Sequence, residues 1–172
     1  GVIKELLTDG VSPDVKSAVE AAIKTYKELG AEIVEVSLPL LEHSIGVYYI
    51  LATAEASSNL ARFDGVKYGY RTPEYKNIDE LYVKSRTEAF GFLTKATILY
   101  GSAVLAKDKY DKCYDKSLRM RRVICDAVNE LFAKYNVILA PACSTLEFNA
   151  YDVLEAFDKV YEESAYTALP SI

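Results

Sequence analysis

Residues 1–38, GVIKELLTDGVSPDVKSAVEAAIKTYKELGAEIVEVSL, decide the fold class of this chain. The apolar start at residues 1–5 predicts a strand, and Ser12 followed by proline is typical of a helix start, because serine caps the first turn and proline suits it. Apolar residues then recur at spacings of three and four as far as Gly30, where glycine commonly ends a helix. Residues 31–38 are rich in valine and isoleucine and predict a second strand. A strand–helix–strand unit favours parallel pairing with a right-handed connection, and therefore an α/β fold.

Beyond this unit the sequence predicts mostly helices. The expected helices, of which the first is largely buried, are residues 40–61, 77–90, 92–106, 107–135 and 151–168. Asn77, with Asp79 and Glu80 in the first turn that follows, is typical of a capped helix start. A short buried strand is expected at residues 137–140, where Pro141 ends it. We find no internal repeat and no linker, so residues 1–172 are expected to form a single domain. The predicted architecture is a helix-rich α/β fold, with helices packed on a few strands of a mixed sheet.

The composition places the chain among ordinary globular proteins. Hydrophobic residues make up 51% and charged residues 26% of the 172 residues, which excludes a disordered chain. The net charge of -5 provides no field that attracts phosphates, so direct binding of nucleic acid is not expected.

The cysteines indicate a reducing compartment. Cys113, Cys125 and Cys143 are odd in number and lack the spacing of a zinc site, so neither a disulfide framework nor a metal site is expected. No apolar run approaches the roughly 18 residues that a membrane span needs. We therefore expect a cytoplasmic protein without a membrane segment.

Both ends of the sequence resemble cuts through a larger domain. The chain begins on a predicted strand and stops at Ile172 without a polar tail, whereas natural termini more often lie outside packed elements. A sheet that lacks neighbouring strands exposes its edge, so self-association of the fragment is expected.

The sequence contains no self-contained active site. It lacks the motifs of serine hydrolases, phosphate-binding loops and zinc proteases, and His43 is its one histidine. Without a partner acid and nucleophile, His43 is interpreted as a surface or capping group. The adjacent carboxylates Asp79 and Glu80, and likewise Glu162 and Glu163, point apart on a helix and are expected to be solvated. Catalytic residues, metal ligands and cofactors are therefore not predicted.

The most distinctive stretch is YYILATAEASSNLARFDGVKYGYR at residues 48–71. It combines an apolar helix, a cluster of small polar residues and an aromatic loop that contains two glycines. One interpretation makes Ala56, Ser57 and Ser58 a close helix-packing surface and pairs Arg62 with Asp64.

This stretch also resembles the amidase-signature family, and within it the A subunits of glutamyl-tRNA and aspartyl-tRNA amidotransferases. The resemblance extends to residues 1–38, to SRTEAFG at residues 85–91 and to VILAP at residues 137–141, and so covers essentially the whole chain. It implies the C-terminal part of an amidase-signature fold.

The resemblance implies where catalysis and substrate binding take place. In the family a lysine, a bridging serine and a nucleophilic serine cleave an amide, and all three lie upstream of the matched region, so this chain has no catalytic residue. The substrate pocket of glutamine-using members corresponds here to Tyr48, Tyr49, Thr97 and Ser164. Thr97 stands at an arginine position and Ser164 at an acid position, with Glu163 one residue away in the alternative register.

The resemblance implies a pocket and scaffold role in an A subunit whose partner subunits receive the ammonia and handle tRNA and ATP. Losing the arginine and the acid removes the groups that hold glutamine, so the substrate is expected to be another small amide or a differently placed glutamine. The alternatives are a non-catalytic binding module and a divergent amidase that acts on a non-glutamine amide.

Overall fold

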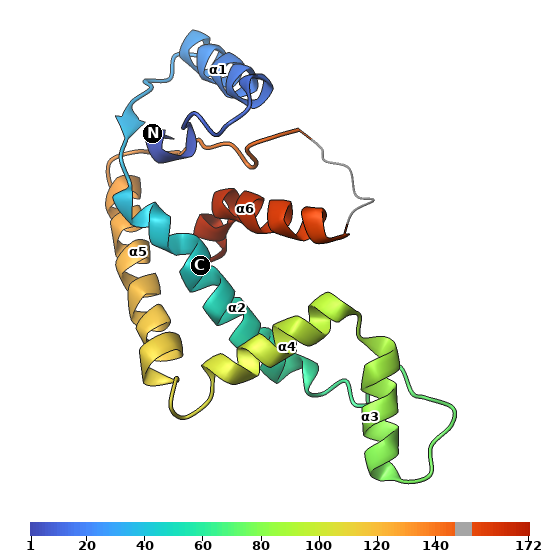
Figure 1. Cartoon of the computed structure of the whole chain (residues 1–172). Helices are drawn as coiled ribbons and strands as arrows, with labels where there is room; N and C mark the ends of the chain where they lie inside the picture. Colours follow the sequence, from blue (N-terminus) through green and yellow to red (C-terminus); the bar gives the residue numbers. More distant parts are fainter. Residues whose placement is uncertain (147–152) are drawn as a thin grey trace. The chain divides into compact units, whose positions relative to one another are not determined.

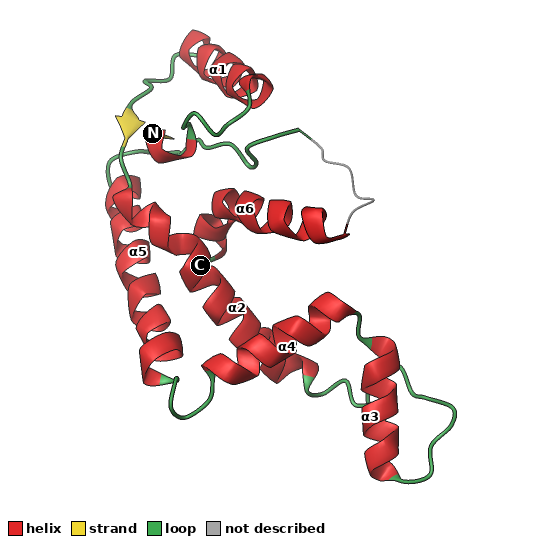
Figure 2. Cartoon of the chain, in the orientation of Figure 1, coloured by secondary structure: helices red, strands yellow, loops and turns green. Residues whose placement is uncertain are grey.

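The structure is a computed structural model that describes residues 1–146 and 153–172 (Figure 1). It divides into two compact units, one formed by Gly1–Tyr48 with Met120–Ile172 and the other by Tyr49–Arg119. Helices dominate both units, as Figure 2 shows. Within the described residues, none of the helices has the length and apolarity that crossing a bilayer requires. The single-domain organisation stays a prediction.

The first unit opens with the predicted strand–helix–strand motif. Strand β1 (Val2–Ile3) and strand β2 (Glu35–Val36) pair in parallel, and helix α1 (Pro13–Glu28) connects them. The Ser12 side chain accepts a hydrogen bond from the backbone N–H of Val15, and Gly30 takes a φ of 91° after the helix, so both predicted ends are confirmed. The α/β class is confirmed as well.

Both strands are shorter than predicted, because the chain turns early on each side. After β1, residues Lys4–Leu6 form a 3-10 turn (η1), and after β2 the Pro39–His43 segment forms another (η2). Glu5 ties the first turn to the residues just before the second, since its carboxylate accepts hydrogen bonds from the Ser37 hydroxyl and the Leu38 backbone N–H. Burial raises the pKa of Glu5, but these hydrogen bonds outweigh it and leave that pKa below its ordinary value.

The segment at residues 137–140 lies on the other side of β1. Leu139 bridges Val2 in parallel, and its N–H donates to the Gly1 carbonyl over 2.7 Å. The prediction of a buried strand is wrong in two respects, because only one bridge forms and Val137 is 67% exposed. Both pairings found in the described residues are parallel, and β1 lies between its two neighbours.

Two helices complete the core of the first unit. Helix α5 (Lys116–Phe132) follows a π-helical turn at Asp111–Asp115, and helix α6 (Val153–Ser171) ends the chain. The predicted helix at 107–135 is therefore shorter, and the first two residues of the one predicted at 151–168 lie outside the described residues. Buried residues of the strands and of the segments that follow them pack with side chains of both helices, and the main members are Ile3, Leu6, Val36, Leu38, Val128, Leu131, Tyr166 and Leu169. Ile3, Leu6, Val36 and Leu38 are the fully buried members, and burying a side chain of this kind stabilises a fold by about 1.5–3 kcal/mol.

Three helices form the second unit together with the loop between the first two. Helix α2 (Ser44–Leu60) enters it from the first unit, and helices α3 (Ile78–Ala89) and α4 (Phe92–Val104) lie wholly within it. The Asn77 side chain caps α3 by accepting from the Glu80 N–H over 2.9 Å, as predicted. Helix α2 is half-buried rather than largely buried, because most of its residues are only partly covered and Glu55, Ser58 and Asn59 are exposed.

Candidate functional site

Helices α2 and α4 cross in backbone contact within the second unit (Figure 1). A Cβ placed on Gly101 would lie 2.0 Å from the carbonyl oxygen of Thr53 and 2.7 Å from the Cβ of Ser57. Beside this point the hydroxyls of Ser57 and Ser102 share a hydrogen bond of 2.9 Å. Only small residues permit this approach, so the interpretation of the Ala-Ser-Ser cluster as a helix-packing surface is confirmed for Ser57.

The crossing sets two of the predicted pocket residues on facing sides. Tyr49 precedes Thr53 by four residues in α2, and Thr97 precedes Gly101 by four residues in α4. Residues four apart share one face of a helix and lie about 6 Å apart along its axis. Tyr49 and Thr97 therefore each lie one turn before the crossing, on the side that faces the other helix. The half-buried Thr97 donates its hydroxyl proton to the Leu93 carbonyl over 2.9 Å.

The other two predicted pocket residues belong to the first unit. Tyr48 is half-buried in α2 at the boundary of that unit. Ser164 lies in α6, where its hydroxyl donates to the Val160 carbonyl over 2.6 Å. Tyr48 and Ser164 thus belong to the first unit, and Tyr49 and Thr97 belong to the second.

Glu163, the alternative acid, is bonded to the protein rather than solvated, which corrects our expectation. Its carboxylate accepts from the backbone N–H of Ser144 over 2.6 Å and from the Ser144 hydroxyl. The Ser144 carbonyl in turn accepts from Ser12, the capping residue of α1, over 2.8 Å. Burial raises the pKa of the nearby Tyr166, and the Glu163 carboxylate raises it further. Glu163 therefore ties α6 to the segment that follows the bridge at Leu139.

The aromatic loop at residues 61–77 is held against α3. Arg86 donates to the carbonyls of Leu60 and Phe63 over 2.8 and 3.0 Å, and so caps the C-terminal end of α2. The Ser85 hydroxyl, which is buried, accepts from the Thr72 N–H over 3.0 Å. A Cβ on Gly65, whose φ is 78°, would lie 2.5 Å from that hydroxyl oxygen, so only glycine fits there.

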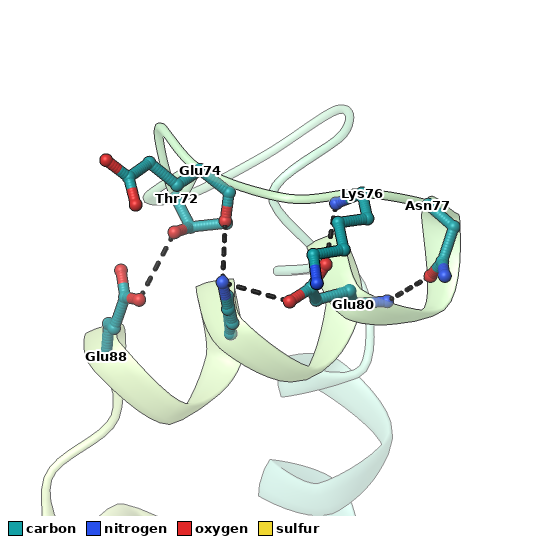
Figure 3. A network of polar contacts seen from close by, with 7 residues as sticks. Thr72, Glu74, Lys76, Asn77, Glu80 and Glu88 are labelled. Atoms are coloured by element: carbon teal, nitrogen blue, oxygen red, sulfur yellow. Dashed lines mark hydrogen bonds and ion pairs between the residues drawn. The ribbon is translucent and has the colours of Figure 1, made fainter.

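Further polar contacts fix the far part of the loop (Figure 3). Glu88 accepts from the Thr72 hydroxyl over 3.2 Å and from the Tyr70 hydroxyl over 2.7 Å, and the second bond raises the pKa of Tyr70. Lys84 donates to the Glu74 carbonyl over 3.1 Å and pairs with Glu80 at 3.0 Å. Hydrogen bonds from Lys84 and then from the Lys76 backbone lower the pKa of Glu80, which is therefore paired rather than simply solvated.

The suggested pairing of Arg62 with Asp64 is wrong. Arg62 donates to the backbone and side-chain oxygens of Asn59 over 3.1 and 2.7 Å. Asp64 instead accepts from the N–H groups of Val66 and Lys67, and these bonds lower its pKa. The short side chain thus organises its own turn, as aspartate commonly does in loops.

Sequence reasoning gave no role to the residues of α3 that hold the loop. One signal was present, since Ser85 follows the buried Leu81 by four residues and therefore lies on the apolar face of the helix. A serine at such a position needs a hydrogen-bond partner. The sequence did not indicate that the partner is the backbone of Thr72.

Comparisons with known proteins agree with this fold. A family model described as Amidase matches residues 1–170. The A subunit of the glutamyl-tRNA(Gln) amidotransferase of Agathobacter rectalis is 52% identical over 145 residues, which are 84% of this chain and 29% of that protein. The corresponding protein of Nitrosomonas europaea is 42% identical over 172 residues, which are 100% of this chain and 35% of that protein.

A solved structure supports the fold independently. The crystal structure of the A subunit of glutamyl-tRNA(Gln) amidotransferase from Thermotoga maritima aligns with a TM-score of 0.59 at 24% identity, over 97% of this chain and 32% of that chain. This chain thus spans about a third of the length of the relatives that it matches. With a family model that matches nearly every residue and relatives of this similarity, the chain belongs to the amidase family.

Proposed function

We propose that this chain is the substrate-pocket and scaffold portion of an amidotransferase A subunit, and that it is inactive alone. The nucleophile of such an enzyme is a serine that a second serine and a lysine activate, and it attacks an amide, forms an acyl-enzyme and releases ammonia. Residues outside 1–172 supply these three groups. Partner subunits, which also handle tRNA and ATP in the cytoplasm, use the ammonia for tRNA-dependent amidation.

The observation that carries this proposal is the crossing of α2 and α4. Helices α2 and α4 are in backbone contact at Gly101 and Thr53, and we infer that Tyr49 and Thr97, which the resemblance assigns to the substrate pocket, face each other one turn before that contact. Rigid elements hold binding groups more precisely than loops do. The names of the similar proteins support the amidotransferase assignment.

A second candidate is an amidase that acts on an amide other than glutamine, and Thr97 favours it. A guanidinium at this position would hold a carboxylate through two charged hydrogen bonds, whereas Thr97 offers one hydroxyl proton, which it donates to Leu93. Ser164 likewise replaces an acid, and its proton goes to the Val160 carbonyl. A substrate without a free α-carboxylate would suit Thr97 better than glutamine does.

A chimeric enzyme tests both candidates. This chain replaces the matching segment of the Agathobacter rectalis relative, the product is assembled with the partner subunits of that organism, and ammonia release is measured from glutamine and from simple neutral amides. We expect the chimera to hydrolyse the neutral amides with a higher kcat/KM than glutamine, and the chain of residues 1–172 alone to hydrolyse neither.

Two results of this experiment would contradict the proposals, and they do so in different ways. Efficient glutamine hydrolysis by the chimera would contradict the altered substrate preference. Release of ammonia from no amide, in a chimera that assembles, would instead indicate a non-catalytic binding module.

We also propose that the isolated chain self-associates through the edges of its small sheet. In the described residues β2 and the segment at Leu139 flank β1, and both present backbone groups on their outer sides. Light scattering coupled to size-exclusion chromatography should show a mass that rises with concentration, and a monomer at every concentration would count against this.

A further inference from the structure

Residues 61–77, which we name the tyrosine loop, differ in charge from the rest of the chain. The loop carries four basic and two acidic side chains, a net charge of +2 in a chain whose net charge is -5. The basic residues are Arg62, Lys67, Arg71 and Lys76. The loop therefore has an excess of positive charge in an acidic molecule.

The tyrosine loop also exposes aromatic rings. Tyr68, Tyr70 and Tyr75 are 57%, 49% and 41% exposed, and Phe63 beside them is 40% exposed. The ring of Phe63 packs at a tilt against Tyr68, with 6.4 Å between ring centres. Tyrosine and arginine are the residues that most often dominate binding energy in protein interfaces.

The loop is fixed before any partner arrives. Arg86 of α3 and the Asp64 turn hold its start, and Ser85 and Glu88 of α3 hold its middle at Thr72 and Tyr70. Arg71 lies over the Tyr75 ring, 5.3 Å from the ring centre, and donates to the hydroxyl of that residue. Rigid tyrosines bury large areas at a small cost in conformational entropy, so a preorganised loop of this composition is suited to binding.

We propose that the tyrosine loop docks an acidic face of another protein, namely a companion subunit of the amidotransferase. The identity of the companion rests on the proposed function. The exposed side chains of Lys67 and Lys76 complement carboxylates on the partner, while the tyrosines supply the apolar contact area.

Two other binding partners, nucleic acid and a second copy of the chain, fit the tyrosine loop less well. Nucleic acid needs a row of cations that neutralise successive phosphates, but Arg62 is bonded to Asn59 of α2 and Arg71 to Tyr75, so only two of the four loop cations remain for phosphates. A second copy of the chain would offer its acidic surface elsewhere on the molecule. Such a head-to-tail contact does not close on itself and leads to open chains.

The test uses the chimeric enzyme described above, with the companion subunits of Agathobacter rectalis immobilised and binding measured by biolayer interferometry. The double variant Lys67→Glu/Tyr68→Ala should bind about 30-fold more weakly, the effect of losing one dominant contact. The matched control is Tyr26→Ala/Lys27→Glu on α1, which removes a tyrosine of 49% exposure and reverses one charge. The control should bind within about twofold of the parent.

The binding results test the docking inference, whereas ammonia release tests the proposed function, so the two can fail separately. Equal binding by the two double variants, or an unsubstituted chimera that does not bind the companions, would overturn the inference. A loop variant that assembles normally but loses tRNA binding would overturn it in favour of an RNA contact. A chimera that binds its companions but releases no ammonia contradicts the proposed function alone. The affinities of the loop variant and of the control variant for the companions can still be compared in that case.

Discussion

Replacing Gly101 with alanine is expected to destabilise the second unit by about 3 kcal/mol, at the upper end of the usual cost of overpacking. The added Cβ would lie 2.0 Å from the Thr53 carbonyl oxygen, and 2.6 Å from its carbon. Both are backbone atoms, so no side chain can rotate away and the helices must separate. Unfolding in urea, followed by far-UV circular dichroism, measures the loss, and amide hydrogen exchange in α4 locates it.

Gly46 supplies the matched control for this experiment. It lies in α2, and a Cβ placed on it meets nothing within 4 Å. The substitution Gly46→Ala therefore gains helix propensity without a clash and should stabilise the protein by roughly 0.5–1 kcal/mol. If both alanine variants unfold at the same urea concentration, the close crossing of α2 and α4 is wrong.

Thr97→Arg is expected to raise kcat/KM for glutamine about 10- to 100-fold in the chimera. The kcat/KM for neutral amides should stay nearly unchanged. The introduced guanidinium would face α2 beside Tyr49, and one charged hydrogen bond contributes about 1.5–3 kcal/mol. Ammonia release from both kinds of substrate measures the effect.

Leu99→Arg is the control for charge alone. Leu99 lies in the same helix and is 71% exposed, so the substitution adds the same cation where it reaches solvent. We expect no change in glutamine selectivity from it. Equal selectivity of the two arginine variants would show that Thr97 does not contact the substrate carboxylate.

The sequence predicted elements whose signals are local. The start of α1 at Ser12, its end before Gly30 and the cap of α3 at Asn77 all depend on side chains within a few residues, and all three were confirmed. Strand lengths were predicted poorly. They depend on tertiary contacts, such as that of Glu5 with Leu38, which periodicity does not encode.

The candidate site was only partly predictable, because its residues are brought together by tertiary contacts. The resemblance to a family supplied the positions Tyr49 and Thr97, but the contact that relates them depends on Gly101 and Thr53 in two different helices. Likewise Glu163 was expected to be solvated, because nothing near it in the sequence indicates Ser144 as its partner. Contacts between distant segments need the fold itself.

The position of β1 between its two neighbours has a consequence for the order in which the chain folds during synthesis. The N–H of Ile3 donates to the carbonyl of Leu139, 136 residues later in the sequence. At a synthesis rate of about 5–20 residues per second, this partner is made roughly 7–27 s after β1. Residues 49–119, by contrast, form a continuous stretch whose internal contacts are complete before Leu139 leaves the ribosome. Synthesis from the N-terminus therefore favours the helical unit as the first to fold, with the sheet closing last.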